Sequence, residues 1–334
     1  MAVMTYAQAA ALALREAMRA DANVVALGED LGRGGVFGQY RGLQEEFGAA
    51  RVIDTPISEA GILGAAVGMA LAGLRPVVEM RVVDFALCAI DEIINQAAKN
   101  RFMFGGQGRV PLVVRMPIGI WSASAAQHSQ SLEAWFAHIP GLVVVTPATP
   151  QDNYSLLKAA LRSGDPVVYM EHKELWGVQG EVEVTADAAD VDADADVDAA
   201  AHALATIGRA RIARAGSDLT LVTWSRGVQP CLDAAQVLSD HGKSVEVIDL
   251  RSLWPWDRDA VLASAQRTGK LLVVHEAVQA GGFGAEIVAT VAEALAIPVK
   301  RLGAPRIPVG YSQPLEDVSR LSVERIVATA RNFF

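Results

Sequence analysis

Two histidines lie in one short stretch of small and apolar residues, AAQHSQSLEAWFAHIPGL at 125–142. An imidazole gains and loses a proton near neutral pH, so a histidine in a pocket can carry a proton during a reaction. His128 is the candidate for that role, whereas His138 is interpreted as a structural residue deeper in the following helix. The alternative for His128 is a polar residue that, beside Gln127 and Ser129, satisfies backbone groups at the start of a helix.

A second candidate group is Glu59, in the stretch DTPISEAGILGAAVGMALAGLRP. The small and apolar residues after it predict a helix over 58–72 that is buried all round and that lets another backbone approach closely. In its first turn, Glu59 would complement the helix dipole. A desolvated carboxylate there could instead hold a proton on a ligand nitrogen. Phe85 could present its ring to a planar ligand or be a core aromatic.

A glycine-rich segment, GEDLGRGGVFG, invites a nucleotide-binding interpretation because it follows an apolar run. Its spacing at Gly32, Gly34 and Gly38 misses the GxGxxG pattern, and no acidic residue closes a second strand at the expected distance. The segment is thus a weak match to a dinucleotide-binding motif, and a nicotinamide-dependent oxidoreductase is kept only as an alternative. The GxxxxGK[ST] and HExxH motifs are absent from the sequence.

The elements that would position these residues alternate between helices and short apolar strands. Such strands, separated by helices, predict a largely parallel sheet that is buried on both faces. In the first half we expect helices at 6–20, 58–72, 84–101 and 152–162, and strands at 24–27, 76–80, 112–115, 142–145 and 167–170.

The pattern breaks at 185–201, TADAADVDADADVDAAA, where aspartates alternate with Ala and Val. This composition offers little apolar area to offset ordering entropy and predicts a mobile linker, although it could also attract basic residues of a partner. A second α/β pattern follows. We expect strands at 219–224, 245–249, 271–275 and 299–302, and helices at 229–239, 257–267, 285–295 and 315–331. At the end of the third strand, His275 and Glu276 are expected to satisfy backbone groups.

The predicted fold class is α/β with two doubly wound domains. The expected boundaries are a first domain at 1–180, an acidic linker at 181–206 and a second domain at 207–334. A net charge of −9 and the lack of a basic stripe argue against a nucleic-acid partner. No apolar run is long enough for a bilayer and the start shows no secretory pattern, so we expect a cytoplasmic protein with no membrane partner. The two cysteines, both expected to be buried, are too few for a disulfide framework or a zinc site.

Several long motifs, taken in order, resemble one known family. They are DTPISEAGILGAAVGMALAGLRPVVE, DFALCAIDEIINQAAKNRFMFGG, AAQHSQSLEAWFAHIPGL, DPVVYMEHK, DLRSLWPWDRDAVLASAQRTGKLLVVHEA and GGFGAEI. The chain resembles the β subunit of the thiamine-diphosphate-dependent decarboxylating component of 2-oxo acid dehydrogenase complexes. That family includes pyruvate, branched-chain and acetoin enzymes. The resemblance implies a transketolase-like pyrimidine-binding domain followed by a transketolase C-terminal-like assembly domain.

The resemblance assigns roles to four side chains. Glu59 matches the cofactor-activating glutamate that hydrogen-bonds the aminopyrimidine ring. Phe85 matches an aromatic beside that ring, and Ile57 lies in the same pocket. His128 matches the histidine on the substrate side.

The resemblance also implies a potassium site built largely from backbone carbonyls. Ser163 replaces an Asp that is usual in the family. The matching positions are Leu112, Ala160, Leu161, Ser163 and Asp165.

The partners are inferred from the resemblance and from a motif that the sequence lacks. Thiamine enzymes anchor the diphosphate through magnesium with a GDG motif, which this sequence lacks. In the family, an α subunit supplies that half of the site, holds most of the magnesium contacts and forms an α2β2 heterotetramer. A dihydrolipoyl acyltransferase core then receives the acyl group on its lipoyl domain.

The main prediction for the reaction is oxidative decarboxylation of a small, pyruvate-like 2-oxo acid. Acetoin cleavage by the same cofactor chemistry is the alternative, and a catalytically silent assembly subunit is a further one. Two departures from the family bear on the substrate. Arg81 replaces an apolar residue near the cofactor ring, and Trp121 lies in a loop that is glycine-rich elsewhere. We expect both to shift the substrate preference away from plain pyruvate.

Overall fold

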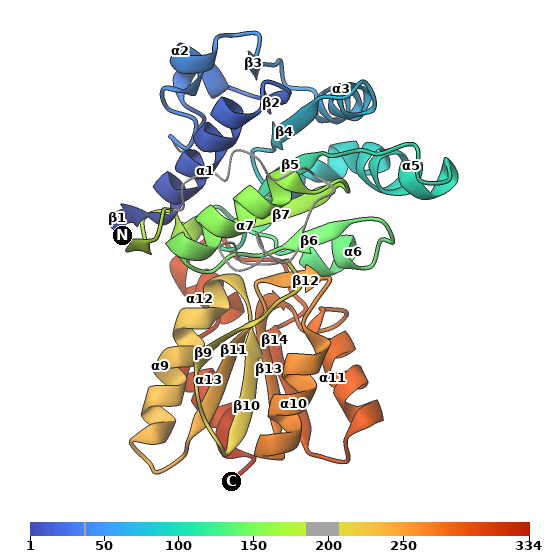
Figure 1. Ribbon diagram of the computed structural model, residues 1–334. Coiled ribbons are helices and arrows are strands. Elements are labelled where there is room, and N and C mark those ends of the chain that lie inside the picture. Colours follow the sequence, from blue (N-terminus) through green and yellow to red (C-terminus); the bar gives the residue numbers. More distant parts are fainter. Residues whose placement is uncertain (37, 185–206) are drawn as a thin grey trace.

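The computed structural model describes residues 1–36, 38–184 and 207–334. Within these residues the chain forms two α/β units, drawn from blue to green and from yellow to red in Figure 1. The predicted fold class is confirmed. The linker expected at 185–201 lies outside the described residues. No helix in the described part is long and apolar enough to cross a membrane.

The first unit is built on a seven-stranded sheet that is parallel except at one edge. Its apolar strands are buried on both faces, as predicted. In spatial order the strands are β12 (Ser252–Trp254), β6 (Val143–Val145), β7 (Val167–His172), β5 (Val113–Ile118), β4 (Arg75–Glu79), β2 (Val24–Gly28) and β3 (Val52–Asp54).

Helices cover both faces of this sheet because successive strand residues point to opposite sides. Val77 and Val113 belong to the core under α1 (Tyr6–Ala20) and α7 (Pro150–Arg162). Their neighbours Val78 and Val114 belong to the core under α3 (Glu59–Leu71). A capping box starts α1, in which the Thr5 side chain accepts from the Gln8 backbone N–H and the Gln8 side chain accepts from the Thr5 backbone N–H.

The remaining elements of the first unit are short. A two-stranded antiparallel pair, β1 (Ala2–Thr5) with β8 (Gln179–Val182), brings the two ends of this unit together. The short helices are α2 (Leu43–Phe47), α4 (Val83–Ala86), α5 (Ala98–Met103) and α6 (Glu133–Ala137).

The second unit has a five-stranded sheet that is parallel except for β9. In spatial order its strands are β14 (Val299–Ala304), β13 (Leu271–Val278), β10 (Leu219–Thr223), β11 (Val245–Asp249) and β9 (Arg211–Arg214). Its helices are α9 (Val228–Ser239), α10 (Arg258–Thr268), α11 (Gly284–Ala294), α12 (Gln313–Ser319) and α13 (Val323–Arg331).

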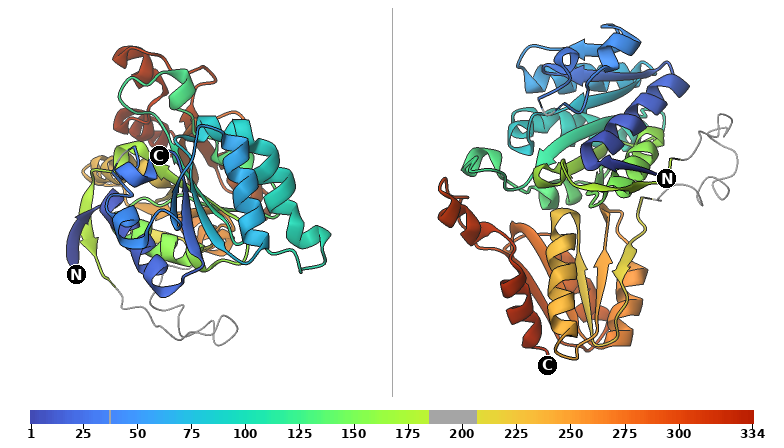
Figure 2. Two further views of the ribbon diagram at one scale, coloured as in Figure 1. Left: turned by 90° about the horizontal axis from the view of Figure 1, so that it is seen from above. Right: turned by 90° about the vertical axis from the view of Figure 1, so that its left-hand side faces the viewer.

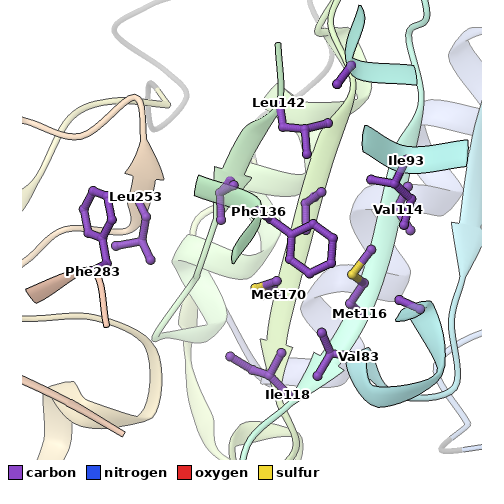
Figure 3. Packing of buried hydrophobic residues seen from close by; sticks show 14 of the residues in the cluster. Val83, Ile93, Val114, Met116, Ile118, Phe136, Leu142, Met170, Leu253 and Phe283 are labelled. Atoms are coloured by element: carbon purple, nitrogen blue, oxygen red, sulfur yellow. The ribbon is translucent and has the colours of Figure 1, made fainter. Parts of the chain in front are cut away.

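The two units share a core. Strand β12 belongs to the second unit in sequence but pairs with β6 of the first sheet. One cluster of buried side chains runs through both units. Figure 3 shows Met116 and Met170 around the Phe136 ring, with Leu253 and Phe283 on the side of the second unit. This shared core holds the first unit against the second unit.

Two predicted helices are broken. The helix expected at 84–101 divides into α4, a 3-10 turn at Leu87–Ala89, a π-helix at Glu92–Ala97 and α5. The helix expected at 315–331 divides into α12 and α13, because the Ser322 side chain caps the second helix by accepting from the Arg325 N–H.

Two predictions about burial were wrong. Only one face of α3 is buried, because small residues on its other face, among them Gly61, Ala65 and Gly68, are exposed within the described part of the chain. Cys88 is exposed, and only Cys231 is buried.

Candidate active site

A cavity of about 710 Å³ lies at the carboxyl edge of the first sheet. Most of its wall comes from the segments that follow the carboxyl ends of β2, β3, β4, β5 and β7, the place where open parallel sheets bind ligands. The lining residues are Glu29, Val36, Ile57, Glu59, Arg81, Val82, Phe85, Trp121, Ser124, His128 and Lys173. The four side chains predicted for cofactor and substrate therefore line one cavity.

Glu59 is the first residue of α3 and is partly buried. Within the described part of the chain its carboxylate makes no hydrogen bond or ion pair, so it is free to bind a group that enters the cavity. Ile57 precedes it and is 77 % exposed, although it is apolar. An unpaired carboxylate beside a bare apolar side chain suits a flat ring that carries nitrogen donors.

Phe85 and His128 meet in the same wall. Their rings make an edge contact, with centroids 5.3 Å apart and planes at 79°. Phe85 comes from α4, whereas His128 ends a helical turn at Ala126–His128 and is exposed to the cavity. The imidazole is thus placed beside an aromatic face and can reach a ligand that lies against that face.

A charged group, the Arg81 guanidinium with its carboxylate neighbours, also lines the cavity. The Arg81 Nη1 atom lies 3.7 Å from Glu29 Oε2 and 3.8 Å from Asp30 Oδ2. Burial raises the pKa of Glu29, Arg81 opposes that rise, and the negative charges of Glu59 and Asp30 add to it. Arg81 therefore balances a local excess of carboxylates while its guanidinium faces the cavity.

Lys173 is a functional candidate that the sequence prediction missed. It is 3 % exposed, and its ammonium donates a hydrogen bond to the backbone carbonyl of His128. Burial lowers the pKa of Lys173 to about 8. Both Lys173 and Glu29 directly follow a parallel strand, and this position could have identified them.

A buried ion-pair network supports the strands behind the cavity. Arg115 is 1 % exposed, and its Nη2 atom lies 2.6 Å from Glu171 Oε2. Its Nη1 atom lies 3.6 Å from Glu79 Oε2, which also accepts from the Tyr40 hydroxyl at 2.8 Å. The network links β4, β5 and β7, from whose ends Arg81, Trp121 and Lys173 follow.

The carbonyl groups predicted for potassium already have protein donors. The Arg75 guanidinium donates to Leu161 O at 2.6 Å and to Ser163 O at 2.9 Å. Leu112 O accepts from the Val167 N–H at 2.8 Å, and Ala160 O accepts from the Ser163 N–H at 3.1 Å. The carbonyl of Asp165 accepts from the Ser163 hydroxyl at 3.0 Å. The potassium site stays a prediction.

His138 is not part of this cavity. It is exposed at the end of α6, instead of lying deep in a helix, and lines a separate apolar cavity of about 940 Å³. His275 and Glu276, expected at the end of a strand, lie inside β13, which continues to Val278. His275 bonds the Ala277 carbonyl and Glu276 accepts from the Ile120 N–H, which confirms that they satisfy backbone groups. Burial lowers the pKa of His275 to about 4.

Comparisons with known proteins identify the family. Residues 2–178 match the family described as transketolase, pyrimidine binding domain, and residues 208–326 match transketolase, C-terminal domain. A 2-oxoisovalerate dehydrogenase subunit beta from Bacillus subtilis (strain 168) is 40 % identical over 99 % of this chain and 98 % of its own length. The chain belongs to the family of thiamine-diphosphate-dependent dehydrogenase β subunits.

Members of the dehydrogenase β-subunit family with different names are similarly close. A mitochondrial pyruvate dehydrogenase E1 component subunit beta-2 from Oryza sativa subsp. japonica is 42 % identical over 98 % of this chain and 85 % of its own length. An acetoin:2,6-dichlorophenolindophenol oxidoreductase subunit beta from Cupriavidus necator is 40 % identical over 96 % of this chain and 94 % of its own. Overall identity therefore does not select a substrate.

The fold agrees with the dehydrogenase β-subunit family. A solved chain described as a split gene transketolase, inactive beta4 tetramer, superposes with a TM-score of 0.75 at 21 % identity, covering 98 % of this chain and 97 % of that one.

The geometry of the glycine-rich segment argues against a dinucleotide site. The segment leads into a 3-10 turn at Leu31–Arg33 and the five-residue α2, without the long helix that a dinucleotide pyrophosphate requires. As in its family, the chain is part of an enzyme that acts with an α subunit.

Proposed function

We propose that the cavity binds the pyrimidine half of thiamine diphosphate and that the complex with an α subunit decarboxylates a small 2-oxo acid. The unpaired carboxylate of Glu59 beside the Phe85 and His128 rings carries this proposal. Glu59 would hold a proton on a ring nitrogen, while Ile57 and Phe85 would contact the ring faces. The Glu59 carboxylate and the two apolar side chains fit the aminopyrimidine in chemical type.

When bound, thiamine diphosphate would supply a carbon nucleophile, and its cationic ring would take up the electron pair released on decarboxylation. The residues of this chain supply proton handling and orientation. His128 is placed to donate a proton or hydrogen bond to the reacting carbonyl oxygen. Lys173 holds the backbone of His128 and so limits where the imidazole can lie.

The partners are proposed on complementary grounds. Metal-binding clusters of three or more His, Cys, Asp or Glu are absent from the described residues, and magnesium prefers oxygen ligands, so the α subunit would supply most ligands for the diphosphate-bound magnesium. The exposed small residues of α3 would allow the close approach of another subunit in an α2β2 heterotetramer. The acyl group would pass to the lipoyl domain of a dihydrolipoyl acyltransferase core.

Reconstitution tests the proposal. We expect the isolated chain to bind thiamine diphosphate weakly, and tight magnesium-dependent binding with 2-oxo acid decarboxylation to require the α subunit. Calorimetry and carbon dioxide release would measure the two properties. Tight magnesium-dependent binding by the isolated chain would contradict the shared site, and turnover of acetoin alone would select the alternative substrate.

Arg81 is proposed to set substrate preference. We expect Arg81→Met to raise kcat/KM for pyruvate about tenfold relative to branched 2-oxo acids, about 1.4 kcal/mol of discrimination, because an apolar side chain would replace a guanidinium in the cavity wall. Steady-state kinetics on pyruvate, branched 2-oxo acids and acetoin would measure the ranking. Arg33→Met, in the neighbouring exposed turn, is the control. An unchanged ranking in Arg81→Met would refute the role.

A further inference from the structure

The loop at 119–130, here called the cavity loop, has an unusual backbone. Three of its non-glycine residues, Ser122, Ala123 and Ala125, have positive φ angles of 48°, 54° and 61°. A side chain disfavours this conformation, which persists only where the surroundings hold it and which often occurs in active sites. The cavity loop therefore needs strong external contacts to keep its shape.

The first unit holds the two ends of the cavity loop. The Gly119 N–H donates to Gln130 O at 2.9 Å, and the Lys173 ammonium donates to His128 O. Neither contact reaches the middle of the loop, where the backbone is strained and where Trp121 enters the cavity wall.

Two carboxylates of the second unit hold the middle of the cavity loop. The Ile120 N–H donates to Glu276 Oε1 at 2.8 Å, and the Ala123 N–H donates to Glu316 Oε1 at 3.1 Å. Glu276 lies in β13 and Glu316 in α12. In the right-hand view of Figure 2, the green helical turn of the loop lies next to the red α12.

Both carboxylates are themselves fixed. The His172 Nδ1 atom accepts from the Glu174 N–H at 3.2 Å, so its Nε2 atom carries the hydrogen that is donated to Glu276 Oε1 at 2.9 Å. Glu316 is fully buried, and its Oε2 atom accepts from Arg320 at 3.2 Å. Rigid acceptors of this kind can impose a strained backbone on a neighbouring loop.

The start of the cavity loop lies close against the His172 ring. A Cβ atom on Gly119 would lie 1.9 Å from His172 Nε2, the atom that contacts Glu276. The backbone of the loop thus touches the same ring that orients the carboxylate holding it.

We propose that Glu276 and Glu316 are positioning residues of the active site. Through the backbone of the cavity loop they hold Trp121 and His128 in the cavity wall, so the second unit completes the site in addition to any role in assembly. The effect of Glu276 and Glu316 on turnover rests on the function proposed above. Their effect on the shape of the cavity loop rests only on the contacts described here.

The test compares a variant that removes the hydrogen-bond acceptor at position 316 with one that keeps it. Glu316→Leu removes the oxygen that accepts from the Ala123 N–H, whereas Glu316→Gln keeps an amide oxygen that can accept from it. In the complex with α subunit, thiamine diphosphate and magnesium, we expect Glu316→Leu to lower kcat about 10- to 100-fold without weaker cofactor binding. Glu316→Gln should retain most of kcat. Asp259→Ala, which removes an exposed carboxylate on α10 of the second unit, is the control and should leave kcat unchanged.

Circular dichroism of the tryptophans can measure whether the cavity loop keeps its conformation, without any substrate. The centroids of the Trp121 and Trp176 rings lie 6.2 Å apart in an edge contact, and we expect this pair to contribute to the near-ultraviolet circular dichroism. Subtracting the spectrum of Trp121→Phe isolates this signal. We expect the signal to be lost in Glu316→Leu and kept in Glu316→Gln. Thermal melting checks folding, and Glu276→Ala against Glu276→Gln repeats the test at an independent contact.

Two results would overturn the proposal. One is an intact Trp121 signal with normal kcat in the acceptor-loss variants. The other is an equal loss of kcat in the Leu and Gln variants with the Trp121 signal intact. If the wild-type complex decarboxylates none of the substrates, the proposed function fails, and the circular dichroism comparison still decides whether the carboxylates hold the loop.

Discussion

Glu59→Gln is expected to lower turnover of the α/β complex by about a thousandfold while leaving the fold intact. Gln has nearly the same volume as Glu but cannot hold a carboxyl proton on a ligand nitrogen. Because Glu59 is partly exposed and makes no ion pair within the described residues, its replacement removes no stabilising partner. Steady-state decarboxylation together with thermal melting would show a loss of activity without a loss of folding.

The matched control is Glu324→Gln. Glu324 also lies in the first turn of a helix, α13 of the second unit, but it is exposed and does not line the cavity. If Glu59 only complements the dipole of α3, the two variants should behave alike, with small effects on stability and none on turnover. That result would favour the catalytically silent subunit over the proposed enzyme.

The strands could be predicted because a strand of a parallel sheet that is buried on both faces is a short run of apolar residues in the sequence. Val24, Val77, Val113 and Val167 all lie in short apolar runs that the structure shows as neighbouring strands. Strand β12 left no such signal. It is three residues long, and its pairing with β6 depends on a tertiary contact between the two units. Short edge elements of this kind are set by their neighbours more than by their own residues.

The candidate site was predictable where a residue follows a strand in a recognisable motif. Glu59 and Phe85 belong to long motifs, and the structure brings both to one cavity. Glu276 was interpreted only as a residue that satisfies backbone groups, and nothing in the sequence shows that its partner is the distant Ile120 N–H. Equally, Ser122 and Ala123 carry no local preference for positive φ, so the shape of the cavity loop depends on contacts from the second unit.

The largest effect on stability is expected from Arg115→Met. This change leaves Glu79 and Glu171 buried without their cation, and breaking a buried pair in this way costs about 3–5 kcal/mol. A domain is commonly stable by only about 5–15 kcal/mol, so the variant should unfold at much lower urea concentrations. Urea unfolding followed by circular dichroism would measure the loss. Arg101→Met, which breaks the exposed ion pair with Asp165, is the matched control and should change little.

The pH dependence of this loss identifies its electrostatic cause. Burial raises the pKa of Glu79 to about 7, above its usual value of 4.5, so between pH 4.5 and pH 7 the folded chain binds a proton that the unfolded chain does not. Protonation neutralises one of the two carboxylates that Arg115→Met leaves unpaired. The loss of stability should therefore be smaller at pH 6 than at pH 8. Glu171→Gln in the same chain should restore part of it, because it removes the second buried charge. An equal loss at both pH values, without rescue by Glu171→Gln, would mean that the arginine acts through packing and not through its charge.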